Sequence, residues 1–307
     1  MTDDCADNLR VPKRLQIETI HGCNARCVMC ALSVGYTRKT GIMNADLFRS
    51  VVDLMAPYCD HVEKVDLFAM GEPLLDPHLF ERIWYVRDKG FSNLSIATNG
   101  DLLDLEKQKR LLDSEIETVI FSIDGIDKQT HESIRPGVSF ERVVDNCQSI
   151  IQLRDEGNYN TRFIIRFIRQ DINVEQWETF QAFWLERLSP DRSDKLIAYD
   201  VNTMGGEITD KMAIIGGQLD EEIERRPCHQ VFDRLIVLTD GTVPLCCEDT
   251  PRARYVMGNI KEASPMEIFN GQQFNRIRQI HQQRNKRSLP ICKECTLLYS
   301  ESAIEVH

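Results

Sequence analysis

The stretch LQIETIHGCNARCVMC, residues 15–30, joins an apolar run to three closely spaced cysteines. Leu15 to Ile20 has the character of a buried β-strand, and Cys23, Cys27 and Cys30 follow it as C-x3-C-x2-C. Three thiolates can hold three irons of a cubane [4Fe-4S] cluster and leave the fourth iron to a ligand that is not a side chain. A zinc ion would need a fourth ligand, for which His21 at the strand edge is a weak candidate.

The rest of the chain repeats a strand–helix pattern that places this cysteine loop. Short apolar runs rich in β-branched residues alternate with segments whose apolar residues recur at helical spacing. The predicted strands begin at Leu15, Val62, Asn93, Ile116, Thr161 and Lys195. Six such units predict an α/β fold, a partial (βα)6 barrel of TIM type, with the cysteines at the carboxyl ends of the strands.

Composition restricts the class of function. The 307 residues exceed the usual size of one core, so we expect a large domain and a smaller one. The net charge of -11 argues against nucleic acid as a partner, because phosphate binding needs a basic face. The sequence has no secretion signal and no long apolar run, which predicts a cytoplasmic protein without a membrane span. We therefore expect a small-molecule substrate.

Eleven cysteines are many for a reducing compartment, where disulfides are rare, and they indicate metal or redox chemistry. Three of them, Cys5, Cys59 and Cys147, lie apart from the others and are expected to be ordinary buried or surface thiols.

The chain changes character after about residue 205. A Gly-containing linker leads to RLIVLTDGTVPLCC, residues 234–247, in which Asp240-Gly241 predicts a hairpin turn between two strands. A basic amphipathic stretch, residues 264–284, follows, and the chain then reaches the C-x2-C of Cys292 and Cys295. We therefore predict a tail over 1–14, a core over 15–205 and a small α+β domain over 206–307.

The cysteine loop resembles the signature of the radical S-adenosylmethionine (SAM) superfamily, which follows the first strand of a six-unit partial barrel. The resemblance implies that the amino and carboxylate groups of SAM bind the open iron of the cluster. It further implies reductive cleavage of SAM to a 5'-deoxyadenosyl radical, which takes a hydrogen atom from a substrate C–H bond. A flavodoxin or ferredoxin type of electron donor is expected as a partner.

Short polar motifs at the ends of the next strands extend this resemblance. Met70-Gly71-Glu72-Pro73 is similar to the family's GGEP loop, which binds the SAM ammonium group, although Met70 replaces its first glycine. Similar proteins place polar groups at the next two strand ends on the methionyl moiety and the ribose. The corresponding residues here are Thr98, Asn99, Ser122 and Asp124. Short strings of this kind are also common as turns or helix caps.

Two arginines near predicted strand ends are candidates for oxygen ligands. Arg135 or Arg166 could hold the SAM carboxylate or a substrate oxygen. Arg166 lies within an apolar strand, where a charge needs a partner, and a structural ion pair is the alternative. Residues 200–202 could bind substrate or simply cap a loop.

Four separated cysteines near the C-terminus form a second set: Cys228, Cys246, Cys292 and Cys295. With DGTVPLCCED before it and CKEC at its end, this region resembles the twitch form of the SPASM domain, which binds one auxiliary [4Fe-4S] cluster. A full SPASM domain needs further cysteines, and twelve residues follow Cys295. A four-cysteine zinc site is the alternative. We choose Cys246 over Cys247 because only one of two adjacent strand residues faces the cluster.

An auxiliary cluster suggests what the reaction is. The architecture resembles the dehydrogenases of sugars and aminocyclitols, such as 2-deoxy-scyllo-inosamine dehydrogenase, in which the cluster can accept the electron released by alcohol oxidation. In an epimerase, Cys247 would donate a hydrogen atom to the substrate instead. Glu248 or Asp249 could bind hydroxyls or amines, or take a proton.

Two further classes of function remain open. Peptide or protein modification is expected less, since only some fourteen residues precede the first strand and a leader-binding domain would need more. A non-catalytic iron–sulfur or zinc scaffold would have no use for an open iron or for the polar strand ends.

Overall fold

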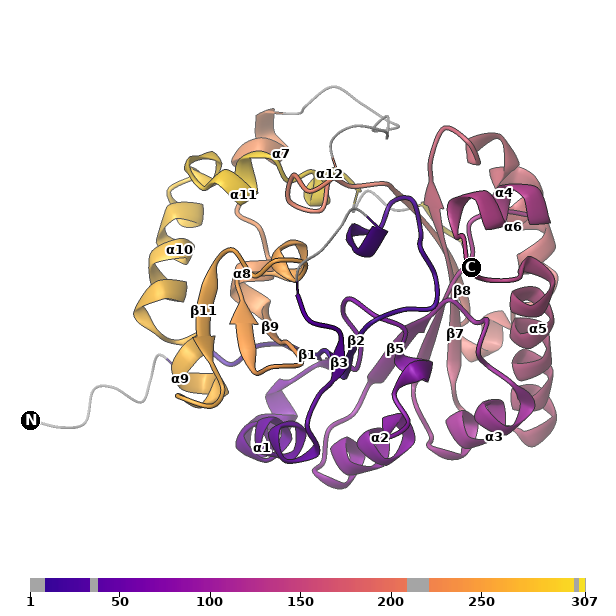
Figure 1. Ribbon diagram of the computed structural model, residues 1–307, viewed down its shortest axis with the longest axis horizontal. Coiled ribbons are helices and arrows are strands. Elements are labelled where there is room, and N and C mark those ends of the chain that lie inside the picture. The colour runs from indigo at the N-terminus through magenta and orange to yellow at the C-terminus, as the bar shows by residue number, and fades with distance from the viewer. Residues whose placement is uncertain (1–8, 34–37, 209–220, 301–303, 307) are drawn as a thin grey trace, which may run out of the picture.

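The computed structural model describes residues 9–33, 38–208, 221–300 and 304–306. An eight-stranded sheet runs through most of the molecule, in the order β12-β8-β7-β6-β5-β4-β1-β9 (Figure 1). Its strands are β1 (Arg14–Ile17), β4 (Lys64–Asp66), β5 (Leu94–Thr98), β6 (Thr118–Ser122), β7 (Arg162–Arg169), β8 (Lys195–Asp200), β9 (Arg234–Val237) and β12 (Ile304–Val306). The strands pair in parallel, except that β12 runs antiparallel to β8. The prediction of an α/β partial barrel is confirmed.

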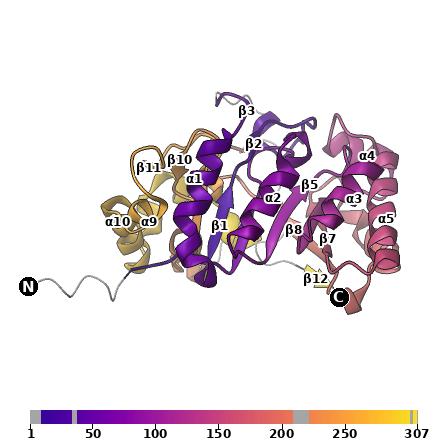
Figure 2. The same cartoon turned by 90° about the horizontal axis from the view of Figure 1, so that it is seen from below.

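Helices cover one face of this sheet. Figure 2 shows α1, α2, α3 and α5 side by side along it. The helices of this half are α1 (Ala45–Met55), α2 (Leu79–Asp88), α3 (Leu105–Asp113), α4 (Lys128–Ile134), α5 (Phe140–Gly157) and α6 (Trp177–Leu185). Polar side chains of Asn44, Asp104, Asp127 and Ser139 cap the first turns of α1, α3, α4 and α5.

Strand alternation gives the sheet two chemically different faces. On β7, Phe163, Ile165 and Phe167 pack into the main hydrophobic core under the helices. The intervening Arg162, Ile164 and Arg166 therefore lie on the opposite face, which we call the inner face. Its apolar part is a small separate cluster of Ala97, Ile120 and Ile164, with Phe68 and Ile197 against it.

The predicted hairpin over 234–247 is wrong in its pairing. The tight turn is present, since Gly241 donates to the Leu238 carbonyl at 2.9 Å and has a φ of +91°. However, β9 pairs in parallel with β1, whereas β10 (Thr242–Pro244) pairs with β11 (Val256–Asn259). Because β9 lies within the predicted smaller domain, that domain shares the large sheet with the core.

The predicted first strand also ends earlier than expected. It divides into β1 and the two-residue β2 (Ile20–His21), which pairs with β3 (Gly41–Ile42). The chain thus leaves the sheet just before the cysteine loop.

Six helices, most of them short, lie in the described part of the C-terminal region. They are α7 (Glu221–Arg225), α8 (Gln230–Asp233), α9 (Pro265–Phe269), α10 (Gln272–Gln282), α11 (Pro290–Lys293) and α12 (Leu297–Ser300). None of the helices within the described ranges is long and apolar enough to cross a membrane. Cys147 is buried and Cys59 half-buried, as expected, while Cys5 and most of the predicted linker lie outside the described residues.

Candidate active site

The three-cysteine loop is held in place by the backbone of the loop after α4. Arg26 and Val28 donate their N–H groups to the carbonyls of Pro136 and Ile134, at 2.7 and 2.9 Å. Gly137, with a φ of +99°, lies so close that a Cβ there would meet the Asn24 carbonyl at 2.6 Å. Glycine therefore permits this contact between two loops far apart in sequence.

The thiols of this loop lie close together and are shielded from water. Burial raises the pKa of Cys23 to about 12 and that of Cys30 to about 11. The guanidinium of Arg135 lies 3.4 Å from the Cys27 sulfur. Because metal ligation requires thiolates, a cation beside a buried sulfur favours the ligating form.

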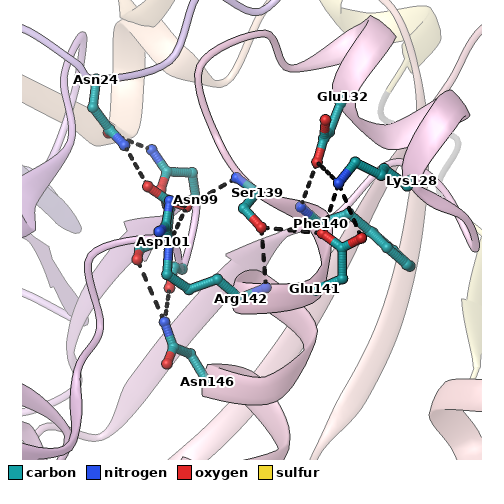
Figure 3. A network of polar contacts seen from close by, with 11 residues as sticks. Asn24, Asn99, Asp101, Lys128, Glu132, Ser139, Phe140, Glu141, Arg142 and Asn146 are labelled. Atoms are coloured by element: carbon teal, nitrogen blue, oxygen red, sulfur yellow. Dashed lines mark hydrogen bonds and ion pairs between the residues drawn. The ribbon is translucent and has the colours of Figure 1, made fainter.

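A polar network ties Asn24, the residue after Cys23, to the end of the third strand (Figure 3). Asn99 donates to Asn24 Oδ1 at 2.8 Å, and Asn24 donates to Asp101 at 3.1 Å. Asp101 also pairs with Arg142 of α5 at 2.7 Å. The amide of Asn99 lies 3.8 Å from the Cys23 sulfur. Asn99 was predicted, whereas Asn24 and Asp101 were missed although both adjoin motif residues.

The loop after the second predicted strand brings Glu72 to the end of the third predicted strand. Glu72 is buried and accepts from Thr98 Oγ1 at 2.7 Å and from the Asn99 N–H at 2.8 Å. Burial raises its pKa to about 7. The preceding Gly71 pairs with Gly22, next to the cysteine loop, and buried Met70 donates its N–H to Glu18 at 3.3 Å. Five of the predicted SAM-binding residues, 70 to 72, 98 and 99, are thus one connected unit.

The fourth strand end forms a buried charge pair. Asp124 accepts from the Ile168 N–H at 2.7 Å and pairs with Arg135 at 2.7 Å. Ser122 accepts from Arg166 at 2.6 Å. Arg135 thus connects Asp124 to the cysteine loop, whereas Arg166 pairs with no carboxylate in the part of the chain that the structure describes.

Glu18 is a buried residue that sequence reasoning missed. It pairs with Arg38 at 2.6 Å and accepts from the Thr239 N–H at 3.1 Å. His21 lies beside both charged groups and is buried, so this weak candidate for a zinc ligand belongs to a structural network.

The C-terminal cysteines gather around Cys246. Burial, followed by the thiols of Cys247, Cys295, Cys228 and Cys292, raises the pKa of Cys246 well above its ordinary value. Cys247 instead reaches Gln230 Oε1 at 3.5 Å and Glu248 Oε1 at 3.7 Å. The side chain of Asp249 stabilises its own loop, because it accepts hydrogen bonds from the N–H groups of Leu245, Arg254 and Tyr255.

His281 of α10 links two of these cysteines and carried no local sequence signal. It is buried, accepts from the Cys228 N–H through Nδ1 at 3.2 Å, and places Nε2 3.6 Å from the Cys292 sulfur. Because Nδ1 is an acceptor, the proton of the neutral ring lies on Nε2 and points to this sulfur.

Comparison with protein families agrees with this geometry. Residues 17–167 match the model of the radical SAM superfamily. The chain contains a radical SAM domain. Residues 228–296 match the SPASM model, an iron-sulfur cluster-binding domain. These two domains of a radical SAM enzyme bind SAM, a SAM-binding [4Fe-4S] cluster and an auxiliary [4Fe-4S] cluster.

Among curated relatives, the radical SAM chain is 31% identical over 135 residues to the AdoMet-dependent heme synthase of Methanosarcina barkeri. That match covers 43% of this chain and 37% of the synthase. This chain is also 24% identical to the tungsten-containing aldehyde ferredoxin oxidoreductase cofactor-modifying protein of Pyrococcus furiosus. That match covers 93% of this chain and 87% of that protein.

Two solved structures share the fold of this chain. BtrN in complex with AdoMet and 2-DOIA has a TM-score of 0.63 and 18% identity, covering 94% of each chain. Streptococcus suis SuiB bound to precursor peptide SuiA has a TM-score of 0.67 and 14% identity, covering 87% of this chain and 66% of SuiB.

The described residues fit SAM and the two clusters of a radical SAM enzyme. The first site offers three shielded thiols, and the guanidinium of Arg135 lies beside the Cys27 sulfur. At Gly71 the backbone comes so close to the chain before the cysteine loop that a side chain would not fit. In the described ranges no three His, Cys, Asp or Glu side chains converge enough to hold one metal ion. A zinc ion would draw four sulfurs to within about 2.3 Å of one point, whereas a cubane cluster spaces its ligands more widely.

Proposed function

We propose that this radical SAM enzyme oxidises a secondary alcohol of a small polyhydroxylated molecule, a sugar or an aminocyclitol. The alcohol would lose a hydrogen atom from carbon, a proton from oxygen and one electron, which leaves a carbonyl group. The first cluster with SAM supplies the hydrogen-atom acceptor, and the auxiliary cluster supplies the electron acceptor. The substrate class, the electron donor and the cytoplasmic location stay predictions.

One observation supports this proposal: five cysteines gather at the C-terminal site, one more than a four-ligand cluster needs. The thiol of Cys246 interacts with those of Cys247, Cys295, Cys228 and Cys292. Without Cys247, the four predicted ligands Cys228, Cys246, Cys292 and Cys295 could close the auxiliary cluster. A cluster with four protein ligands has no free iron for substrate, which suits an electron acceptor. We propose these four residues, with Cys23, Cys27 and Cys30, as the cluster ligands.

The remaining candidate residues have proposed roles in this reaction. Glu72, Thr98 and Asn99 hold the SAM methionyl moiety, while Asp124, Ser122 and Arg135 orient the first cluster and SAM. Arg166 binds a substrate oxygen. Glu248, which is buried beside Cys247, takes the hydroxyl proton.

A radical epimerase is the second candidate, and the surroundings of the Cys247 thiol favour it. The Cys247 thiol contacts Gln230, and its pKa is affected by Arg234 and Arg14 at the inner face. A thiol on the substrate side of the cluster could return a hydrogen atom to carbon.

Iron analysis comes first in the test of this function. After anaerobic reconstitution we expect about eight irons per chain, falling to about four when Cys23, Cys27 and Cys30 are all alanine. SAM-dependent release of 5'-deoxyadenosine by the loaded wild type is expected. Its absence with both clusters present would contradict the enzyme function.

Mass spectrometry in deuterated water then separates the two reactions over a panel of sugars, aminocyclitols and short peptides. A product lighter by two hydrogens supports dehydrogenation. Solvent deuterium retained at carbon, lost in Cys247→Ser and kept in the control Cys59→Ser, supports epimerisation. Turnover of the peptides alone would contradict both.

A further inference from the structure

Three arginines on the inner face of the sheet pair with no carboxylate among the described residues. Arg162 and Arg166 lie on β7 and Arg234 on β9, and all three are half-buried. Each makes a single side-chain hydrogen bond, to Thr118 Oγ1 at 2.8 Å, Ser122 Oγ at 2.6 Å and Gln16 Oε1 at 3.2 Å respectively. The Nε atoms of Arg162 and Arg166 are buried without a hydrogen-bond partner. Charges withdrawn from water need counter-charges, so these positions favour an anion.

Two of these arginines belong to a larger cationic group, which consists of Arg14, Lys64, Arg162 and Arg234. Arg14 lies directly across from Lys64 on one neighbouring strand and from Arg234 on the other. Arg162 lies on β7, further along the sheet on the same inner face, where the strand register places it opposite Thr118 of β6.

One buried carboxylate faces the cationic group. Asp66 is fully buried, pairs with Arg14, accepts from Ser95 Oγ at 2.5 Å and lies 3.8 Å from Lys64. Burial lowers the pKa of Lys64 to about 8; Asp66 opposes this shift, while Arg14, Arg162 and Arg234 add to it. Four cations against one carboxylate leave a surplus of three positive charges, in a chain whose net charge is -11.

We infer that the cationic group binds an acidic group of the substrate, a carboxylate or a phosphate, chiefly through Arg162 and Arg234. This inference rests on the proposed function and narrows its substrate class to acid-bearing polyols. Guanidinium groups suit such anions because they bind carboxylate and phosphate oxygens in a fork geometry. A substrate whose only charges are ammonium groups would be repelled here.

The position of the cationic group suits this role. At a strand rise of about 3.3 Å, Arg162 lies about 13 Å along β7 from Arg166, which neighbours the first cluster site. Between these two ends lies the small apolar cluster of Ala97, Ile120 and Ile164. Cys247 is on the side of Arg14 and Arg234. A sugar anchored by its acid group would thus extend from the cationic group towards the cysteine loop.

Calorimetric titration of the reconstituted holoenzyme, saturated with SAM, tests this inference without turnover. The probes are inorganic phosphate, glucose 6-phosphate, gluconate and, as neutral control, glucose. We expect the anions to bind and glucose not to bind. Binding of both phosphates but not gluconate assigns the site to phosphate, and the reverse assigns it to carboxylate.

Matched variants place the binding site. Arg234→Gln and Arg162→Gln are expected to weaken anion binding at least tenfold, and Arg234→Lys to recover part of it. Arg276→Gln, which removes an exposed arginine of α10, is the charge-matched control and should bind as wild type. Arg234 lies on an edge strand with one hydrogen bond, so its variants test the site even if Arg162→Gln fails to fold.

Equal weakening in all variants including the control, or no anion binding by the wild type, would overturn the inference. Release of 5'-deoxyadenosine is measured on the same samples. Its loss in the wild type would refute the proposed function while the titration still reports anion binding, so the two failures are distinguishable.

Discussion

The main chain of Gly71 pairs with that of Gly22 in a parallel bridge, and no side chain fits between them. A Cβ on Gly71 would collide with the Ile20 carbonyl and lie 2.9 Å from the Gly22 carbonyl. The loop that carries Glu72 is therefore held directly against the strand that leads to the cysteines. Met70, where related loops have glycine, contributes only its backbone N–H to this contact with Glu18.

Gly71→Ala is expected to lower the free energy of unfolding by about 2 to 4 kcal/mol, since backbone atoms rather than a flexible side chain must move. SAM binding should weaken with it. Gly41→Ala is the matched control, because nothing lies within 4 Å of its new Cβ. Urea denaturation compares the two variants, and equal stability would contradict the steric argument.

The buried carboxyl group of Glu72 is expected to make the stability of the fold depend on pH. Its pKa is raised by burial to about 7 in the folded chain, from an ordinary value of 4.5. The folded state therefore binds more protons than the unfolded state between about pH 4.5 and 7, so stability falls as pH rises through this window. A shift of this size corresponds to about 3 kcal/mol.

Glu72→Gln should remove this part of the slope, as measured by urea denaturation without SAM at several pH values. The change of slope, rather than the absolute stability, is the decisive quantity, because glutamine also alters the hydrogen bonds to Thr98 and Asn99. An unchanged slope would show that the carboxylate is ionised throughout the window.

The elements that sequence patterns predicted well are those decided locally. Helical spacing placed α1 and α5, and apolar runs placed β5 and β7, because each pattern is contained in one segment. The partner of β9 was missed, since its pairing with β1 joins residues more than 200 positions apart and depends on tertiary packing. The short α4 was also missed.

The candidate site shows the same division. The cysteines, Glu72 and Asn99 belong to motifs with recognisable spacing. His281 and Glu18 do not belong to such motifs. His281 lies in a basic helix and Glu18 between β1 and β2, and only the folded chain brings their partners to them. The cationic group could not be predicted either, because its four members come from four strands.

The buried ion pair of Asp194 and Arg154 is expected to contribute strongly to the free energy of unfolding, although it lies far from the site. Two hydrogen bonds of 2.7 and 2.8 Å join these fully buried side chains. Asp194→Ala leaves the buried guanidinium with Asp155, a partly exposed carboxylate, as its remaining ion-pair partner among the described residues. This change is expected to cost about 3 to 5 kcal/mol. Glu81→Ala removes the exposed partner of Arg110 and should cost less than about 1 kcal/mol. Thermal or urea unfolding of both variants checks this; similar losses would contradict it.

His281 is expected to raise the reduction potential of the auxiliary cluster through its Nε2–H group beside the Cys292 sulfur. A hydrogen bond to a ligating sulfur stabilises the more negative, reduced cluster. His281→Phe keeps an aromatic ring but removes the donor, so the potential should fall by an amount on the order of tens of millivolts. Redox titration followed by electron paramagnetic resonance measures it, and the SAM-binding cluster serves as internal control. Equal shifts of both clusters would indicate a general change of fold, whereas no shift with intact iron content would show that the Cys292 sulfur receives no hydrogen bond from this ring.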